Sequence, residues 1–282
     1  SQVVGRKAEV GIAFDGDADR CLAVDENGEM IDGDQILSIV GLDMKNRGIL
    51  KRDTIVATVM SNLGFTIMSK EQDINLVQTR VGDRYVLEKM LKHGYNLGGE
   101  QSGHVIFLDY NTTGDGLITA IQLLYVMKKT GKPLSELKKC MQIFPQVLVN
   151  AHVKNENKHA YIEDPEIQER IDALEQKFKG EGRVLIRPSG TEPLVRVMIE
   201  GKDQAVIEKE AQELIRLLKG MLCHVNLIPV NNVEERDFKR PDKSHIYRFR
   251  DILEKNNIPA TVRISMGSDI GGACGQLRRK HK

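Results

Sequence analysis

Short apolar segments alternate with longer amphipathic segments along the first half of the chain. Where the segments are short, rich in β-branched residues and bounded by Gly, Asp or Asn, the pattern predicts strands. The strands predicted in this way are residues 10–14, 54–59, 75–79 and 105–108. Helices are predicted where apolar residues recur every three or four positions. These are residues 35–47, 63–71, 85–93, 117–130 and, as one more short helix, 134–140.

This alternation predicts a mixed-sheet α/β domain whose sheet is covered by helices. In the segment 117–130, one helical face is expected to lie in the core. That face consists of Leu117, Ala120, Ile121, Leu124 and Met127.

The pattern changes after residue 145. Alternating apolar residues predict a strand from residue 146, followed by helix 164–178, strands 183–187 and 194–200, and helix 203–219. Two helices interleaved with three strands predict a small α+β domain. A last block contains strand 225–228, helix 245–256 and strand 261–264, which predicts a short α/β tail.

Three aspartates alternate with small residues at the end of the first predicted strand, in the motif Asp15-Gly16-Asp17-Ala18-Asp19-Arg20. Side chains at alternate positions of an extended segment project to one side, so these carboxylates can converge on one ion. Carboxylate oxygens suit Mg²⁺ or Ca²⁺. Arg20 can hold a phosphate beside that ion.

Two alternatives to a metal loop remain. An EF-hand loop begins with the same aspartate spacing, and Glu26 falls at its twelfth position. However, Arg20 occupies the place where that loop needs glycine, and the flanking segments are predicted strands. The other alternative is a solvated acidic turn. The preceding strand and the internal arginine favour the metal loop.

Residues 98–104, Gly-Gly-Glu-Gln-Ser-Gly-His, have glycines on both sides of a polar centre. Such glycines let the backbone approach a ligand closely. Glu100 and Ser102 offer an acceptor and a donor to the hydroxyls of a sugar. A tight turn between strands, with an exposed glutamate, is the alternative.

Two further motifs are compatible with phosphate binding. Residues 187–193, Arg-Pro-Ser-Gly-Thr-Glu-Pro, are followed by Arg196, and two arginines beside Ser-Gly-Thr suit a phosphate dianion. An ordinary hairpin loop is the alternative. Residues 79–85 precede a helix and are either a substrate loop at its N-terminus or a helix start capped by Asp83.

Composition narrows the class of protein. The chain has 282 residues, 40% hydrophobic and 29% charged, which is ordinary for a globular protein. No apolar run reaches the length of a membrane span. Four scattered cysteines predict a reduced, cytoplasmic setting. Residues 222–282 contain 12 basic against 7 acidic residues, so an acidic body precedes a basic tail.

The four motifs in this order resemble the α-D-phosphohexomutase family, closest to its members that act on glucosamine phosphates. The resemblance covers about residues 1–218. It rests on GIAFDGDADRCLAVDENG, TRVGDRYV, GGEQSGH and RPSGTEPLVRVMIEG. It implies four parts. Residues 1–33 are the end of a second domain with the metal loop, and residues 34–145 are a sugar-binding third domain. Residues 146–219 are a phosphate-binding fourth domain, and residues 220–282 form a tail.

The resemblance also implies a hexosamine phosphate as substrate and Mg²⁺ as cofactor. The residues implied for Mg²⁺ are Asp15, Asp17 and Asp19, with Arg20 in support. Those implied for the sugar are Glu100 and Ser102, with Gly82, Asp83 and Arg84 as the loop that accepts either sugar orientation. Those implied for the non-transferred phosphate are Arg187, Ser189, Gly190, Thr191 and Arg196.

In that family the nucleophile is a serine in an upstream Ser-His-Asn-Pro loop. This sequence does not contain the loop, since Ser244-His245 is followed by Ile246. Phosphoryl transfer depends on a positioned nucleophile. We therefore expect this sequence by itself to bind ligand without turnover.

The tail resembles a different family, the radical-SAM ribosomal RNA adenine methyltransferases, over about residues 219–279. The similar segments are CHVNLIPVN, ERDFKRPDKSHIYRF and TVRISMGSDIGGACGQL. The resemblance implies S-adenosylmethionine contact at Asn231 and methyl uptake at Cys274. The family's three-cysteine iron–sulfur motif is not present in this sequence. A fusion of two family fragments is therefore expected, and the alternative function is a methyltransferase remnant, or a non-functional chimera, with RNA affinity through the basic tail.

Overall fold

The computed structural model describes residues 2–153, 158–178, 180–190, 192, 194–217, 225–227, 243–255 and 260–262. These residues fall into two compact units, the first ending at Ile143 and the second beginning at Phe144. The predicted α/β fold with a mixed sheet is confirmed. None of the helices in the described ranges combines the length and the apolar character that crossing a bilayer requires.

The first unit begins with a small antiparallel sheet in the order β1-β2-β3. Its elements are α1 (Gln2–Arg6), β1 (Val10–Phe14), β2 (Cys21–Asp25) and β3 (Met30–Ile31). In β2 the buried face consists of Cys21, Ala23 and Asp25, because alternate side chains of a strand lie on one face. The loop between β1 and β2 contains the three aspartates.

A second sheet in the first unit has the order β5-β4-β6-β7. Strands β5, β4 and β6 are parallel, and β7 is antiparallel to β6. The elements from α2 onward are α2 (Gly33–Asn46), η1 (Lys51–Asp53), β4 (Thr54–Thr58), α3 (Leu63–Glu71), β5 (Asn75–Thr79), α4 (Asp83–His93), β6 (Leu97–Gly99), β7 (Val105–Phe107), α5 (Gly116–Thr130), α6 (Leu134–Leu137) and η2 (Lys138–Cys140).

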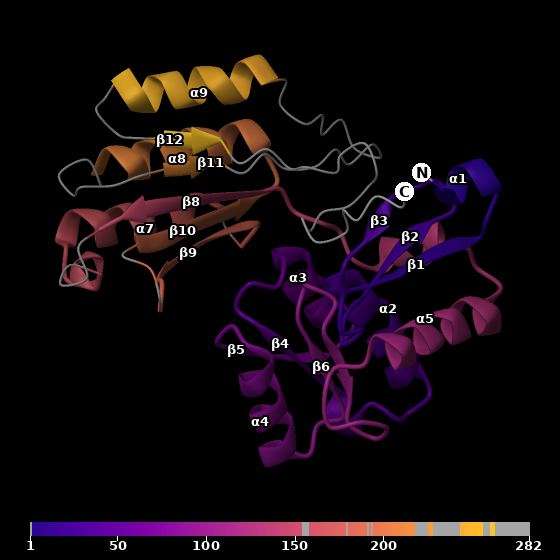
Figure 1. Ribbon diagram of the computed structural model, residues 1–282. Helices are drawn as coiled ribbons and strands as arrows, with labels where there is room; N and C mark the ends of the chain where they lie inside the picture. Colours follow the sequence, from indigo (N-terminus) through magenta and orange to yellow (C-terminus); the bar gives the residue numbers. More distant parts are fainter. Residues whose placement is uncertain are drawn as a thin grey trace. The chain divides into compact units, whose positions relative to one another are not determined.

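Helices cover both faces of this second sheet (Figure 1). On one face Val56 packs with Val86 and Met90 of α4. On the other face Ile55 and neighbouring strand residues join the core formed with α2, α3 and α5. Every residue of β4 is buried, as expected for a central strand between two helical layers.

The expected core face of α5 is wrong for three of its five residues, while Ala120 is buried and Met127 packs against the core. The residues that α5 buries are Gly116, Thr119, Ala120, Leu123 and Val126. Leu117, Ile121 and Leu124 are exposed instead. The helix is apolar on two sides, so its periodicity does not identify the buried side. The Thr119 hydroxyl can be buried because it donates to the Asp115 carbonyl (2.7 Å).

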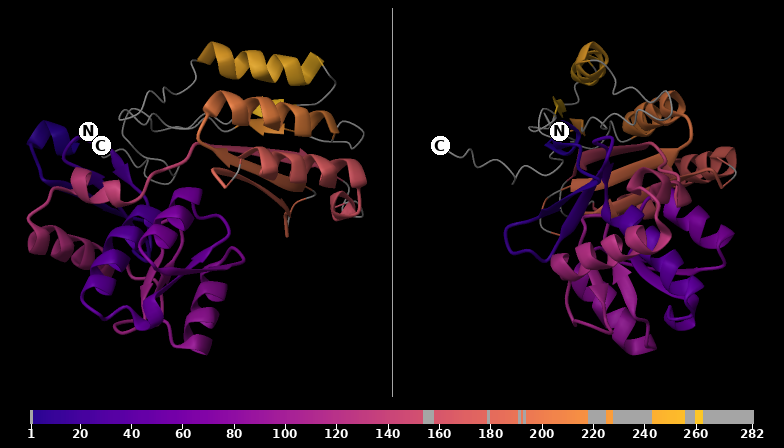
Figure 2. Two further views of the ribbon diagram at one scale, coloured as in Figure 1. Left: turned by 180° about the vertical axis from the view of Figure 1, so that it is seen from behind. Right: turned by 90° about the vertical axis from the view of Figure 1, so that its right-hand side faces the viewer.

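The second unit is built on an antiparallel sheet in the order β8-β10-β9. Its elements are β8 (Gln146–His152), η4 (Ala160–Ile162), α7 (Pro165–Phe178), β9 (Gly182–Pro188), β10 (Leu194–Gly201), α8 (Gln204–Leu217), β11 (Val225–Leu227), α9 (Lys243–Lys255) and β12 (Ala260–Val262). Helices α7 and α8 cover one face of the sheet, as Figure 2 shows. The core there includes Val149, Val197 and Leu174.

The described part of the tail forms a strand–helix–strand unit. Strand β11 pairs in parallel with β12, and α9 lies between them in the sequence. Ala260 belongs to the same core cluster as Val149 and Val197, with Phe249 of α9 packed against it. The described tail residues therefore share the core of the second unit.

Candidate functional site

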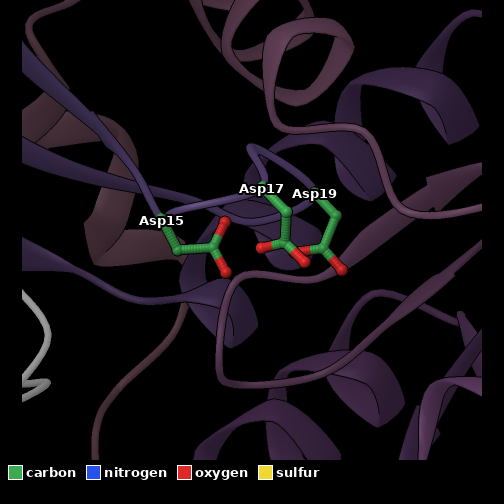
Figure 3. A group of neighbouring side chains, drawn as sticks. All are labelled: Asp15, Asp17 and Asp19. Atoms are coloured by element: carbon green, nitrogen blue, oxygen red, sulfur yellow. The ribbon is translucent and has the colours of Figure 1, made fainter.

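The three aspartates between β1 and β2 converge. One carboxylate oxygen from each of Asp15, Asp17 and Asp19 lies within 4.8 Å of the others (Figure 3). The loop turns tightly because Ala18 has a φ of 58° and its N–H donates to the Asp15 carbonyl (3.3 Å). The N–H of Arg20 closes the loop by donating to Asp15 Oδ1 (3.2 Å).

The loop is not an EF-hand. Strands, and not helices, flank it. Glu26, at the twelfth position of the hypothetical calcium loop, lies at the far end of β2 and accepts hydrogen bonds from the backbone N–H (3.4 Å) and the hydroxyl of Ser135. It therefore lies apart from the three aspartates.

Negative charge on this loop is only partly compensated. Burial raises the pKa of Asp19, His104 opposes this effect, and Asp15 and Asp17 reinforce it, so that the pKa lies above its ordinary value. Burial also raises the pKa of Asp15, but hydrogen bonds with the backbone N–H of Arg20 and with the side chains of Asp17 and Asp19, together with the charge of Arg20, lower it below the ordinary value. The Arg20 guanidinium lies 3.7 Å from Asp15 and 3.9 Å from Asp19. One arginine beside three carboxylates leaves an excess that a divalent cation would balance.

His104 joins the metal loop to a second motif. Its Nε2 lies 3.4 Å from Asp19 Oδ2 and 4.0 Å from Asp83 Oδ2, and only 4% of its side chain is exposed. Its Nδ1 is buried without a hydrogen-bond partner among the described residues. The sequence pattern indicates no role for this histidine, although it ends the motif at residues 98–104. Its contact with Asp19 depends on how segments 85 residues apart meet.

Glu100 connects the sugar motif with the start of α4. Its Oε1 accepts a hydrogen bond from the N–H of Gly82 (2.9 Å), and its Oε2 accepts one from the Ser102 hydroxyl (3.5 Å). Asp83 does not cap the helix, since Gly82 is the N-cap residue and Asp83 faces His104. The predicted loops at residues 79–85 and 98–104 therefore lie together.

Arg84 lies apart from this cluster in the structure. Its side chain is 81% exposed, and its guanidinium pairs with Glu88 one turn along α4 (2.7 Å). The proposed role of Arg84 as part of the orientation loop stays a prediction.

Gly98 and Gly99 were expected to let the backbone approach a ligand, but the structure gives them a different role. Both belong to β6, where a Cβ on Gly98 would lie 2.8 Å from the Val56 carbonyl and a Cβ on Gly99 would lie 2.5 Å from the His104 carbonyl. They permit close packing inside the protein. Gly103, with a φ of 94°, is the glycine that the turn requires.

In the second unit, two arginines face each other across neighbouring strands. Arg187 of β9 is paired in register with Arg196 of β10. Burial lowers the pKa of Arg187, and the charge of Arg196 adds to this effect. Arg187 Nε is buried and has no hydrogen-bond partner within the described part of the chain. Arg196 is paired with Glu192 (3.1 Å). A buried donor without a partner, on one of two adjacent arginines, is suited to an anion.

The loop that follows Arg187 is organised by Ser189. Its N–H donates to the Leu194 carbonyl (2.8 Å), and its hydroxyl accepts a hydrogen bond from the N–H of Glu192 (3.2 Å). Lys158 donates to the Ser189 carbonyl (2.9 Å) and adds a third cation, which no motif in the sequence indicated. Gly190 lies in the same loop.

Three residues assigned from the resemblances lie outside the described residues. They are Thr191 in the phosphate motif, and Asn231 and Cys274 in the tail.

Two models of one protein family match the chain. Residues 32–144 match the alpha/beta/alpha domain III of phosphoglucomutase/phosphomannomutase, and residues 148–217 match the C-terminal domain of the same family. The chain therefore contains two domains of the phosphohexomutase class. They are similar in sequence to those of phosphoglucosamine mutases: the enzyme of Ruminiclostridium cellulolyticum is 64% identical over 216 residues, which are 77% of this chain and 48% of that enzyme. The chain thus spans about half the length of the curated relatives that it matches.

Solved structures have the same fold at lower sequence identity. A phosphoglucomutase/phosphomannomutase family protein from Burkholderia thailandensis is similar with a TM-score of 0.60 and 24% identity, over 78% of this chain and 48% of that one. Aspergillus fumigatus N-acetylphosphoglucosamine mutase in complex with GlcNAc-6P and magnesium gives a TM-score of 0.59 and 21% identity, over 73% of this chain and 51% of that one.

Proposed function

We propose that this chain supplies metal-, sugar- and phosphate-binding loops of a phosphoglucosamine mutase, which interconverts glucosamine 6-phosphate and glucosamine 1-phosphate. The observation that carries the proposal is the convergence of Asp15, Asp17 and Asp19 beside His104 and Asp83. Three separate motifs meet there. The 64% identity with a phosphoglucosamine mutase supports the choice of substrate class.

The donor set fits Mg²⁺. Asp15, Asp17 and Asp19 supply three hard oxygen ligands. Burial, reinforced by the charges of Asp15 and Asp17, raises the pKa of Asp19, and a bound cation would compensate these charges. When bound, Mg²⁺ supplies positive charge that stabilises a transferring phosphoryl group. Arg20 remains 46% exposed and can contribute to holding that phosphate. The related complex with GlcNAc-6P and magnesium supports this assignment.

The remaining residues would bind and orient the substrate. Glu100 and Ser102 present oxygens to sugar hydroxyls, while Glu100 also holds the loop that contains Gly82, Asp83 and Arg84. In the second unit, the non-transferred phosphate would lie on the arginine pair and the adjoining loop. Its residues are Arg187, Ser189, Gly190, Thr191 and Arg196.

None of these residues is assigned as the nucleophile. Their proposed work is to bind and orient, and binding without turnover by this sequence alone stays a prediction. A coupled assay with glucosamine 1-phosphate, Mg²⁺ and a trace of bisphosphate activator tests it. Turnover together with a phosphorylated species in the intact mass would show that a serine of this chain acts as nucleophile.

Calorimetric titration with glucosamine 6-phosphate in the presence of Mg²⁺ tests the proposed function. We expect saturable binding that weakens with EDTA and is lost for glucosamine, which lacks the phosphate. The absence of binding at millimolar ligand, with the protein shown to be folded, would contradict the proposal. Galactosamine 6-phosphate, which differs only in the orientation of the C4 hydroxyl, serves as the matched control for the sugar hydroxyls.

The methyltransferase resemblance of residues 220–282 stays a prediction, as do contact with S-adenosylmethionine and RNA affinity. If the basic tail binds RNA, retention of RNA at low salt should disappear when residues 222–282 are deleted. Unchanged retention in the deletion variant would contradict a role of the tail.

A further inference from the structure

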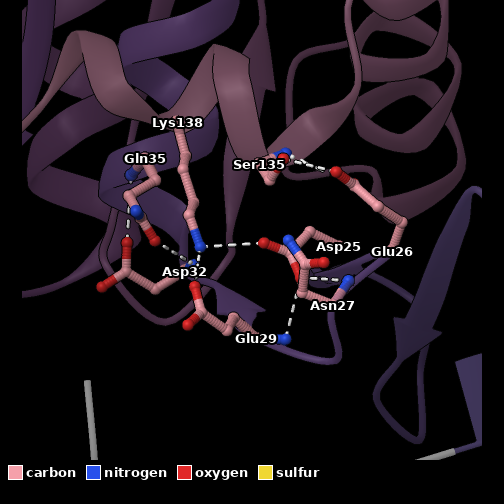
Figure 4. A network of polar contacts seen from close by, with 8 residues as sticks. All are labelled: Asp25, Glu26, Asn27, Glu29, Asp32, Gln35, Ser135 and Lys138. Atoms are coloured by element: carbon pink, nitrogen blue, oxygen red, sulfur yellow. Dashed lines mark hydrogen bonds and ion pairs between the residues drawn. The ribbon is translucent and has the colours of Figure 1, made fainter. Parts of the chain in front are cut away.

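Lys138 lies in a polar cluster at the end of β2 opposite the metal loop. Its Nζ lies 2.8 Å from Asp25 Oδ2 and also pairs with Glu29 (Figure 4). Asp25 is fully buried, and only 8% of the Lys138 side chain is exposed. These charges are therefore shielded from water and depend on one another.

The carboxylate of Asp25 also organises the turn between β2 and β3. Its Oδ1 accepts hydrogen bonds from the N–H groups of Asn27 (3.0 Å) and Glu29 (2.9 Å). Asp25 thus uses one oxygen for the turn and the other for Lys138. Glu26, in the same turn, accepts hydrogen bonds from Ser135. The turn is attached to α6 and η2 by two side-chain links.

Lys138 belongs to a segment that is itself fixed. Leu134 in α6 is fully buried, and Met141 just after η2 is 3% exposed; both belong to the core that includes α2 and β4. The lysine is therefore a rigid point on the body of the first unit. The hairpin of β1 and β2 is attached to that point.

The side chains on the buried face of β2 indicate what the charge of Asp25 contributes to the fold. Cys21, Ala23 and Asp25 are the buried residues of this strand, so a carboxylate follows two apolar side chains on one face. Sliding the strand by two residues would move Asp25 to an apolar position and leave Lys138 without its partner. A buried ion pair of this kind favours one register over the alternatives.

The other end of the same strand leads to the metal loop. The N–H of Cys21 donates to the Gly103 carbonyl (3.0 Å), and the N–H of Gly116 donates to the carbonyl of Ala18 within the loop (3.0 Å). Both ends of β2 are thus attached to the first unit, across roughly 14 Å of strand. One short strand therefore joins Asp25 to the loop that contains Asp15, Asp17 and Asp19.

We propose that Lys138 is a positioning residue: its pairing with Asp25 and Glu29 sets the register of the β1–β2 hairpin and thereby places the three aspartates for metal binding. The metal part of this inference rests on the proposed function. Lys138 acts through the hairpin and does not itself contact the metal loop's carboxylates.

The experiment combines Mn²⁺ binding, followed by its EPR signal, with hydrogen exchange of the full chain. In Lys138→Met we expect Mn²⁺ affinity to fall roughly 2- to 30-fold, the range for residues that act through a packed network. Exchange should accelerate across residues 10–25 but not in α4. Lys138→Arg should restore both readouts, because it retains the charge and hydrogen bonds. Lys132→Met, which breaks an exposed pair with Glu136 in the adjoining segment, is the matched control.

If Lys138→Met has the same Mn²⁺ affinity and the same hydrogen-exchange rates as Lys132→Met, the proposal is overturned. If Lys138→Met unfolds the first unit, the neutral pair Asp25→Asn with Lys138→Met replaces it. If this double variant folds and its hydrogen exchange over residues 10–25 is faster than in the wild type, the proposal is supported. If its exchange equals that of the wild type, the proposal is overturned. If the wild-type chain binds no Mn²⁺, the proposed function fails, and the positioning role is decided by hydrogen exchange alone.

Discussion

The metal loop of the first unit and the arginine pair of the second unit both concentrate charge of one sign, but they do so by different means. Asp15, Asp17 and Asp19 come from one short loop, so their spacing in the sequence brings them together. Arg187 and Arg196 come from two strands, so the register of the sheet brings them together. Local spacing can be recognised in a sequence, whereas register depends on the folded sheet.

The sugar loop of the first unit (residues 98–104) and the loop after Arg187 in the second unit also differ in how tightly they are packed. In the first unit, the sugar loop lies against α2 so closely that a Cβ on Gly33 would lie 2.1 Å from the Glu100 carbonyl. In the second unit, a Cβ on Gly190 would meet no described atom within 4 Å. The sugar loop is therefore held by backbone contact, while the loop after Arg187 is held mainly by hydrogen bonds of Ser189. Substitutions should affect the two sites independently.

The largest effect is expected for Asp17→Asn, which removes one of the three charges at nearly constant volume. We expect Mn²⁺ affinity to fall on the order of 100-fold, because ligand charge determines affinity for hard cations and even the residues behind the ligands contribute about 10- to 100-fold. Phosphate binding to the second unit should not change. Electron paramagnetic resonance measures the first quantity and calorimetry the second.

Asp172→Asn, an exposed aspartate on α7, is the control for Asp17→Asn and should bind Mn²⁺ like the wild type. Without metal, Asp17→Asn should not lower the free energy of unfolding, because it relieves repulsion among the carboxylates. Equal Mn²⁺ affinity in the two variants would contradict the metal site.

The second effect is expected for Arg187→Met, which removes the half-buried guanidinium but keeps much of the side chain's length. Hydrogen bonds to charged groups contribute about 1.5–3 kcal/mol, so affinity for glucosamine 6-phosphate should fall roughly 10- to 100-fold. Mn²⁺ affinity should stay unchanged. Lys202→Met, which breaks an exposed pair with Glu181, is the control. Unchanged calorimetric affinity in Arg187→Met would show that phosphate binds elsewhere.

The contrast between spacing and register also explains how much could be predicted from the sequence. Strands β1 and β5 and helix α3 have the predicted bounds, because their patterns are local. The sequence predicts β2 only as a strand flanking the aspartate motif, without bounds. Strand β6 was missed because it contains two glycines, which are poor strand formers.

At the candidate sites, the convergence of the three aspartates followed from spacing, but the partners of these residues did not. His104 reaches Asp19, Lys158 reaches Ser189 and Lys138 reaches Asp25 across long stretches of chain. Such contacts are determined by topology and register, which one sequence without repeats or pairing signals does not specify. The exposed apolar side of α5 has the same explanation, since periodicity shows that a helix has faces but not what covers them.

A pair of glycine substitutions compares the packing of the two sites. Gly33→Ala forces its Cβ against the backbone of Glu100, Gln101 and Gly103, so we expect it to lower the free energy of unfolding by about 1–3 kcal/mol. It should also displace the sugar loop and weaken binding of glucosamine 6-phosphate. Gly190→Ala, in open space, should cost much less. Chemical denaturation measures both, and equal costs would contradict the difference in packing.

The smallest effect concerns an aspartate whose charge is compensated. Burial raises the pKa of Asp109, but hydrogen bonds from Asn96 and Lys51 and the charge of Lys51 lower it below the ordinary value of 3.8. A lowered pKa means that this carboxylate stabilises the fold above the pKa of the unfolded chain, and that the contribution disappears as the pH falls through the lowered value.

Asp109→Asn should therefore lower the free energy of unfolding by about 0.2–1 kcal/mol at pH 7, because the pair is largely exposed. The difference from the wild type should vanish at pH values well below 3.8, and urea denaturation across pH 2–7 measures it. If Asp109→Asn still lowers the free energy of unfolding in acid, Asp109 contributes through packing and not through its charge. Charge compensation would then not explain how Asp109 differs from the carboxylates of the metal loop.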